Sequence, residues 1–144
     1  MKYHFKIHNE ESGYWAQCIE LEGCITEADD MTKLQHNMKE VLNLYLDESE
    51  NSEFIFALPK KNVKGKNIVK VDVHPKVAFA MTMRMLRLKK GLTQKETAKL
   101  LGMKNLYSYQ RLESSKQVNP SLTMLGRIKQ VFPELKIDDL LSEV

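Results

Sequence analysis

Alternating apolar and polar residues open the chain and predict an antiparallel sheet. Over residues 2–8, three large apolar side chains alternate with lysines and histidines, which is the period of a half-buried strand. The polar segment that ends at Gly13 predicts a hairpin turn. Residues 14–19 are rich in aromatic and extended-chain formers and predict a second strand, and residues 24–26 predict a short third strand.

A change to three-and-four spacing then predicts a helix whose N-cap is Asp29 or Asp30. Its apolar stripe is expected to contain Leu34, Met38, Val41, Leu42, Tyr45 and Leu46. Residues 51–67 contain proline, glycine and several lysines and predict a loop, whereas residues 68–73 alternate again and predict a fourth strand. We therefore expect residues 1–73 to form a β-β-β-α-β domain, in which one helix covers a small sheet.

The rest of the chain has only helical periodicity and predicts an all-α domain over residues 77–144, so the fold class is α+β. A helix is expected over residues 76–89, with five apolar positions facing the core. These positions are Val77, Ala80, Met81, Met85 and Leu88. Another helix is expected to start at residues 119–120, because proline suits the first helical position. Its core-facing residues are expected to be Leu122, Leu125, Ile128 and Val131. A last turn is expected at residues 138–141.

Between these helices, residues 92–113 have the pattern of a helix-turn-helix. Thr93 and Glu96 have the spacing of a capping box, in which the hydroxyl accepts from one amide and the carboxylate from the other. Ala98 is small enough to let a second helix cross closely, and Gly102 can adopt the positive φ that ends a helix. The apolar contacts between the two helices are expected from Leu100, Leu101, Leu106, Tyr109 and Leu112.

The second helix of this motif, over residues 105–113, is the predicted recognition helix, and the first covers residues 94–101. A helix-turn-helix places its second helix in the major groove of DNA. Arginine can pair with guanine and asparagine with adenine, while lysines attract phosphates. The predicted DNA-binding residues are Gln94, Lys95, Lys104, Asn105, Tyr107, Ser108, Arg111 and Lys116. The alternative is that these are ordinary surface residues of an all-α domain.

Charge is distributed unevenly, although the net charge is only +3. Residues 1–50 hold four Lys or Arg against eleven Asp or Glu, whereas residues 77–144 hold twelve against six. Such a split favours two partners of opposite charge, the alternative being solvated acidic and basic faces. No apolar run approaches the ~20 residues that span a membrane, and the first residues do not resemble a signal peptide. We therefore expect a cytoplasmic protein.

The cysteines and histidines offer a second kind of chemistry. Cys18 and Cys24 are expected to be reduced thiols. A zinc site formed with His4 and His8 is the alternative, but none of the four has the paired spacing of a zinc finger, which favours core or surface roles. A nucleophilic cysteine needs a basic neighbour, and both cysteines have acidic ones. With no phosphate-binding glycine loop either, we predict no catalytic residue, metal or cofactor.

These segments together resemble a known family. The extended start, Gly13-Tyr14-Trp15, Leu21-Glu22-Gly23-Cys24 and the amphipathic helix resemble the N-terminal domain of HicB-type antitoxins. The helix-turn-helix that follows resembles the HicB subclass with a Cro/repressor-like DNA-binding domain. The resemblance implies a degraded RNase H-like domain that binds a small, basic, mRNA-cleaving toxin of the HicA type and covers its catalytic histidine. It also implies that a homodimer, or a higher even-numbered oligomer, binds the double-stranded operator DNA of its own operon.

Two other functions remain open on the sequence. The chain can be an ordinary helix-turn-helix transcriptional regulator whose N-terminal domain senses a small molecule or mediates dimerisation. It can also be a nuclease, which would require clustered carboxylates that bind Mg²⁺.

Overall fold

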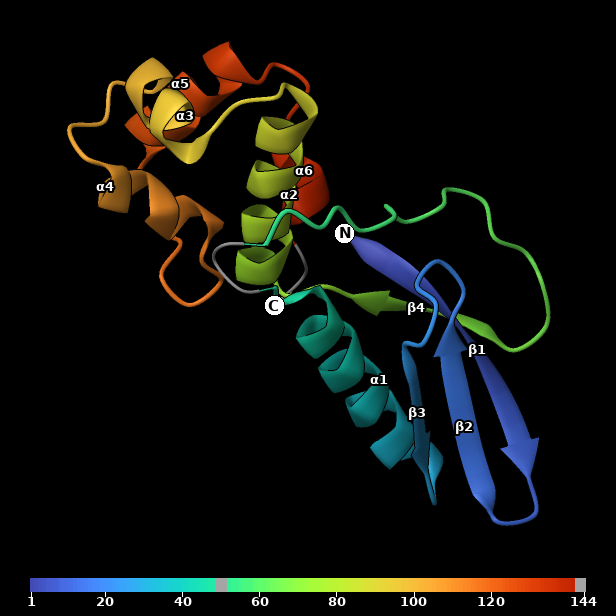
Figure 1. The fold of residues 1–144 in the computed structure, drawn as a ribbon. Helices are drawn as coiled ribbons and strands as arrows, with labels where there is room; N and C mark the ends of the chain where they lie inside the picture. Colours follow the sequence, from blue (N-terminus) through green and yellow to red (C-terminus); the bar gives the residue numbers. More distant parts are fainter. Residues whose placement is uncertain (49–51, 142–144) are drawn as a thin grey trace. The chain divides into compact units, whose positions relative to one another are not determined.

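The computed structural model describes residues 1–48 and 52–141, which form two compact units (Figure 1). Unit 1 contains Met1–Leu46 and Phe56–His74, and unit 2 contains residues 47–48 and 52–55 together with Pro75–Leu141. The predicted domains, residues 1–73 and 77–144, include residues 49–51 and 142–144, which lie outside the described part. The α+β class predicted for the chain is confirmed, with the sheet in unit 1 and a helical unit 2.

Unit 1 is a four-stranded antiparallel sheet in the order β3-β2-β1-β4, with one helix on it. Its elements are β1 (Lys2–Glu10), β2 (Gly13–Cys18), β3 (Ile25–Ala28), α1 (Met31–Leu46) and β4 (Ile68–Asp72). Their order along the chain confirms the predicted β-β-β-α-β arrangement. The third strand begins one residue later than predicted and extends two residues further.

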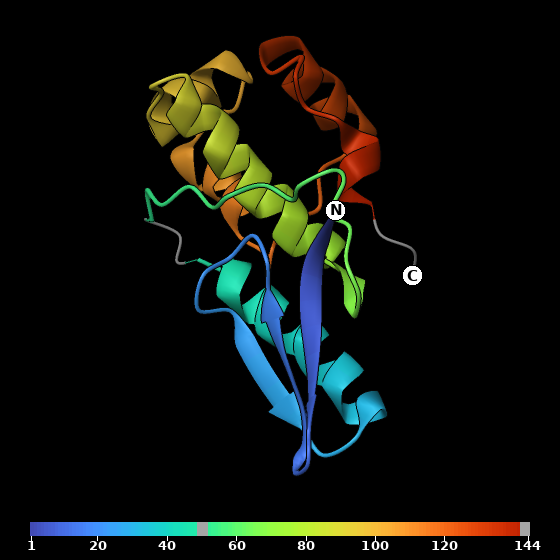
Figure 2. The same cartoon turned by 90° about the vertical axis from the view of Figure 1, so that its right-hand side faces the viewer.

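The helix α1 runs along one face of the sheet (Figure 1, Figure 2). It begins after Asp30, whose Oδ1 accepts a hydrogen bond from the Lys33 amide at 2.8 Å, so the aspartate N-cap is confirmed. Four of the six residues predicted for the apolar stripe are buried, whereas Val41 and Tyr45 are half-buried. Tyr45 lies at the margin, where its hydroxyl donates to the Glu22 carbonyl at 2.7 Å.

The other face of the sheet contains a buried ionisable pair. Strand alternation places His4 opposite the core, yet its side chain is 4 % exposed and that of Glu20 is 1 % exposed. His4 Nδ1 lies 2.7 Å from Glu20 Oε2, which also accepts from the Lys60 amide at 3.1 Å. Burial raises the pKa of the Glu20 carboxyl, but hydrogen bonds from His4 and Lys60 outweigh burial, so the pKa lies below its ordinary value. The loop after α1 therefore covers a strand position that the pattern predicts to be outward-facing.

Unit 2 is helical, and its first helix is central to it. Its elements are α2 (Pro75–Lys89), α3 (Gln94–Leu100), α4 (Leu106–Gln110), a 3₁₀ turn η1 (Arg111–Glu113), α5 (Leu122–Val131) and α6 (Ile137–Leu140). The helix α2 packs against η1 and α6, and α3 packs against α4. Residues 78–87 of α2 are buried around the whole helix, which includes Arg84 and Arg87. Of the five apolar positions predicted to face the core, Val77 and Leu88 are only half-buried.

The predicted start of α5 at residues 119–120 is wrong. The helix begins at Leu122, because the Ser121 hydroxyl accepts from the Met124 amide at 3.1 Å and caps the helix there. Leu122, predicted to face the core, lies in the first turn and is 87 % exposed, whereas Ile128 is buried as predicted. Leu125 and Val131 are half-buried. The last turn lies at Ile137–Leu140, one residue earlier than predicted.

Candidate DNA-binding site

The first helix of the motif, α3, is fixed at both ends by the predicted signals. The Thr93 hydroxyl accepts from the Glu96 amide and the Glu96 carboxylate accepts from the Thr93 amide, each at 3.0 Å, so the capping box is confirmed. These hydrogen bonds hold the pKa of the Glu96 carboxyl below its ordinary value. Gly102 has a φ of 70° and follows the helix, as predicted, and Ala98 is buried.

The second helix of the motif is shorter than predicted. It begins after Asn105, whose Oδ1 accepts from both the amide and the hydroxyl of Ser108, at 2.8 and 2.9 Å. The α-helix ends at Gln110, and the predicted span to residue 113 is completed by the 3₁₀ turn η1. Tyr109 and Leu112 are buried, as the predicted recognition helix requires.

Two of the five predicted interhelix contacts are wrong. Leu101, Tyr109 and Leu112 are buried, but Leu100 is 56 % exposed and Leu106 is 41 % exposed. Leu100 is two residues beyond the buried Ala98, which places it about 200° around the helix, on the opposite face. Leu106 is the first residue of α4 and directly follows its N-cap.

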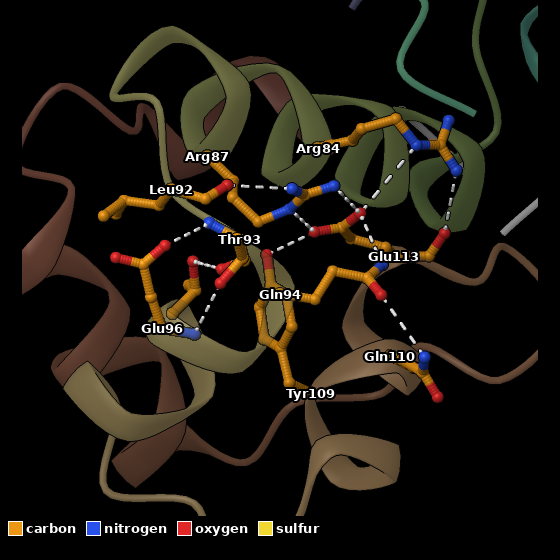
Figure 3. Close-up of polar contacts among 10 residues, drawn as sticks. Arg84, Arg87, Leu92, Thr93, Gln94, Glu96, Tyr109, Gln110 and Glu113 are labelled. Atoms are coloured by element: carbon orange, nitrogen blue, oxygen red, sulfur yellow. Dashed lines mark hydrogen bonds and ion pairs between the residues drawn. The ribbon is translucent and has the colours of Figure 1, made fainter. Parts of the chain in front are cut away.

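A buried carboxylate joins the elements of the motif (Figure 3). The Glu113 side chain is 1 % exposed, and Arg87 of α2 donates to its two oxygens, from Nε at 2.6 Å and from Nη2 at 3.1 Å. Arg84 Nε lies 3.8 Å from the same carboxylate. Burial lowers the pKa of the Arg87 guanidinium, but its hydrogen bonds to Glu113 outweigh burial and raise the pKa above its ordinary value. Arg87 also donates to the Leu92 carbonyl at 3.0 Å, which fixes the turn before α3.

The same carboxylate orients a predicted DNA-binding residue. Gln94 Nε2 donates to Glu113 Oε1 at 3.2 Å, and Gln94 Oε1 accepts from Gln110 Nε2 at 3.3 Å (Figure 3). The buried Tyr109 hydroxyl also donates to Glu113. Burial is the main cause that raises the pKa of this tyrosine above its ordinary value, and the negative charge of Glu113 is the next. The side chain of Gln94, at the start of α3, is thus held by hydrogen bonds to η1 and α4.

The structure leaves most of the predicted DNA-binding residues on the surface of unit 2. Six of them are exposed: Lys95, Lys104, Asn105, Tyr107, Arg111 and Lys116. Gln94 and Ser108 are half-buried and engaged in the hydrogen bonds described above. Residues 104–111 bring five of the set together on the turn before α4, on α4 itself and at the start of η1. Their contacts with DNA stay a prediction.

The sequence-based prediction missed the residues that support this surface. Arg84 and Arg87 were not assigned a role, and neither were Gln110 and Glu113. One signal was available. Arg84 and Arg87 are the two charged residues in the largely apolar segment 77–88, and buried arginines must find an acid to pair with. The sequence does not show which acid, because Glu113 lies 26 residues from Arg87.

Comparison with known proteins agrees with this geometry. Residues 83–140 match the family model described as Helix-turn-helix (HTH_3), which covers the second half of α2 and all elements from α3 to α6. Unit 2 thus carries a DNA-binding helix-turn-helix domain of the kind found in transcriptional regulators. The chain is also 38 % identical, over 56 residues, to a UPF0150 protein of Helicobacter pylori (strain J99), a match that covers 39 % of this chain and 76 % of that protein. The chain belongs to the UPF0150 family.

Two further findings concern other classes of site. Within residues 1–48 and 52–141, no helix has the length and apolar character needed to cross a membrane. The same residues contain no group of three or more His, Cys, Asp or Glu side chains arranged to hold a metal ion. Cys18 and Cys24 are buried free thiols, and Cys18 donates to Glu20 Oε1 at 3.7 Å. That the protein uses no metal or cofactor and has no catalytic residue stays a prediction.

Proposed function

We propose that this protein is a cytoplasmic antitoxin that also represses its own operon. Unit 1 binds and neutralises a small mRNA-cleaving toxin of the HicA type, and unit 2 binds operator DNA as a homodimer or a higher even-numbered oligomer. The observation that carries the proposal is the exposed polar surface of residues 104–111 on a helix-turn-helix, in a chain of the UPF0150 family whose first 50 residues are rich in acidic side chains. A degraded RNase H-like origin of unit 1 is part of the same proposal.

The DNA-binding half of the proposal rests on the arrangement of α4. Its inner residues pack on α3, so its outer residues are free to enter a major groove. Arg111 offers a bidentate donor pair for guanine. The Asn105 oxygen caps α4, which leaves its amide nitrogen to donate to a base or a phosphate. Lys95, Lys104 and Lys116 supply charge toward the phosphates, an attraction that weakens as salt rises.

Replacing Arg111 by alanine tests the DNA-binding half. We expect operator binding to weaken by about 1–3 kcal/mol, the range for a specific base contact, with toxin neutralisation unchanged. The measurement is a titration of labelled DNA from upstream of the gene, at fixed salt. Arg127→Ala is the matched control, because Arg127 is exposed on α5 and its removal takes away the same charge. Equal losses in the two variants would show that Arg111 contributes only non-specific charge.

The toxin-binding half rests on the charge and shape of one cleft in unit 1. A cleft of about 490 Å³ lies where the β1–β2 hairpin, the end of β3 and the first turns of α1 meet. Its lining includes the carboxylates Glu10, Glu27 and Asp29, together with the rings of Tyr14 and Trp15. Carboxylates beside aromatic faces suit the cationic side chains of a basic partner. We place the main toxin contact at this cleft.

Charge reversal tests that contact. The double variant Glu27→Lys/Asp29→Lys is expected to lose toxin binding by at least roughly tenfold, because it turns attraction of a basic partner into repulsion. Glu22→Lys/Glu40→Lys is the matched control, since it makes the same change in net charge at exposed positions outside the cleft. The readouts are toxin affinity and relief of growth arrest, with operator binding as the internal standard. An equal loss of toxin affinity in both double variants would show that the toxin contact does not lie at the cleft.

The alternative is a plain transcriptional regulator whose unit 1 senses a small molecule or mediates dimerisation. An open apolar cleft of about 500 Å³ between α1 and β4 is the feature that favours it. That function predicts operator binding without any toxin partner. Co-expression with the neighbouring gene separates the two, because only the antitoxin retains a small basic protein through purification.

A further inference from the structure

The strand β4 lies at the edge of the sheet, with β1 as its neighbour on one side. Two backbone hydrogen bonds fix how it faces β1: the Val73 amide donates to the Met1 carbonyl at 3.0 Å, and the Ile7 amide donates to the Asn67 carbonyl at 2.8 Å. In an antiparallel pair, every second residue of a strand directs both its amide and its carbonyl to the same neighbouring strand, and the residues between them direct both groups to the other side. The odd-numbered residues of β4 therefore face β1.

The even-numbered residues Ile68, Lys70 and Asp72 direct their amide and carbonyl groups to the opposite side, along the edge of the sheet. Asn43 of α1 closes one end of this edge. Its Nδ2 lies 3.4 Å from the Asp72 carbonyl oxygen, and its Oδ1 accepts from the His74 amide at 2.7 Å. The open edge thus ends at Asp72, whose carbonyl has a second lone pair to offer.

An apolar cleft lies beside the same edge. The helix α1 packs mainly on β3 and β2, and between α1 and β4 a space of about 500 Å³ remains. Its apolar lining includes Ile7, Met31, Met38, Val69 and Val71. An edge strand that offers backbone groups next to such a cleft has the two properties that strand addition uses.

The side chains of β4 select the occupant. We propose that β4 pairs antiparallel with β4 of a second copy of this chain, about a two-fold axis at Val71, and joins the two sheets into one. In this register Lys70 of each copy lies opposite Asp72 of the other, and both residues have their backbone groups on the open edge. Opposite charges facing each other across strands stabilise such a pair. This interface depends on neither the DNA nor the toxin of the proposed function.

The other registers that use the same backbone groups fit less well. Centring the axis on Lys70 places two lysines opposite each other, which is repulsive. Centring it on Val69 places Lys70 opposite Ile68 and leaves the lysine without a charge to pair with. In the register centred on Val71, the two Val71 side chains meet on the inner face of the joined sheet, beside both clefts.

The present surroundings of Asp72 support this choice. Its Oδ1 is buried and makes no hydrogen bond within the part of the chain that the structure describes. Its ion pair, with Lys2 Nζ, is 4.0 Å long and involves a lysine side chain that is half exposed. A lysine from a second copy, placed directly opposite, supplies the closer donor that this carboxylate lacks.

The mass of the full chain in solution, measured by light scattering during size exclusion without DNA or toxin, tests the interface. Lys70→Asp gives an all-acidic edge and Asp72→Lys an all-basic one, so each variant alone repels its own copies. We expect the dissociation constant of the β4–β4 pair to rise roughly tenfold or more in each variant. At concentrations at which the native chain is paired, the mass of each variant should be half the native mass. Mixing the two variants in equal amounts restores the larger mass, because acidic and basic edges then face each other.

Two controls keep the result specific to the edge. Lys6→Asp makes the same charge change on β1, one strand away from the edge, and leaves the mass unchanged. Lys70→Pro removes an amide that faces away from β1, so it spares the sheet but halves the mass. If unit 2 also dimerises, with a copy other than the β4 partner in a closed assembly, the native mass is that of four chains and the variants show two. A monomeric native chain, variants of unchanged mass, or a mixture that stays at half mass would overturn the proposal.

Discussion

The buried carboxylate of Glu113 is expected to be the polar group on which the stability of unit 2 depends most. Replacing it with alanine removes the acceptor for two hydrogen bonds from Arg87, one from Gln94 and one from Tyr109. The side chain of Arg87, 8 % exposed, then loses the counter-charge that accepts two of its hydrogen bonds. Water does not easily replace it, because α2 is buried around its whole circumference.

The size of the effect follows from this burial. Removing one partner of a buried ion pair costs about 3–5 kcal/mol, because the other charge stays desolvated and unpaired. A unit of this size has a free energy of unfolding of about 3–10 kcal/mol in total. Glu113→Ala is therefore expected to leave unit 2 marginally folded at 25 °C. Glu134→Ala is the matched control, since Glu134 is nearly half exposed and its ion pair with Lys90 is 3.8 Å long. An exposed pair of that kind contributes at most about 1 kcal/mol.

Two spectroscopic probes separate the units in one urea titration. Trp15, the single tryptophan, reports on unit 1 through its fluorescence. Circular dichroism at 222 nm reports mainly on unit 2, which holds most of the helical residues. We expect Glu113→Ala to shift the circular dichroism transition to much lower urea and to leave the Trp15 transition in place. Equal shifts for Glu113→Ala and Glu134→Ala would refute the reasoning, as would a shift confined to Trp15.

Two further predictions concern glycine positions and pH. Gly102→Ala is expected to lower the free energy of unfolding of unit 2 by about 1 kcal/mol, because φ is 70° there. Gly126→Ala is expected to raise it by about 0.5–1 kcal/mol, because Gly126 is helical and an added β-carbon meets no atom within 4 Å. Urea unfolding measures both changes. The pKa of Glu20 is lowered by folding, so the unfolded chain takes up its proton first and unit 1 loses stability as pH falls below about 4.5. Trp15-monitored unfolding between pH 6 and 3 should show a smaller loss for Glu20→Gln, and identical slopes would contradict this assignment.

Local signals made much of the architecture predictable from the sequence. Strand alternation identified the strands of unit 1, since a half-buried strand must place alternate residues on the core. The capping box of Thr93 and Glu96 and the glycine at position 102 fixed both ends of α3, because each acts within one helical turn. The start of α5 failed for a related reason, since the cap at Ser121 took precedence over the preference of Pro120 for a first turn.

Contacts between distant residues were not predictable in the same way. Arg87 and Glu113 have the composition of surface residues, and only the packing of α2 against η1 brings them together. His4 has the alternation of an outward-facing residue, but the loop that follows α1 covers it and supplies a backbone donor to its partner Glu20. The polar surface of α4 was predictable as a set because burial of Tyr109 fixes which side faces out. The hydrogen bonds that restrain Gln94 were not.

The proposed function requires one protein to have two separable binding activities. The most direct test is to co-express the tagged full chain with its neighbouring gene, purify the complex by size exclusion, and assay growth arrest together with operator binding. We expect a small basic protein to remain bound, growth arrest to be relieved, and the complex to retain specific binding to the operator. A chain that binds the operator but retains no partner, and relieves no growth arrest, would contradict the antitoxin function and leave a plain transcriptional regulator.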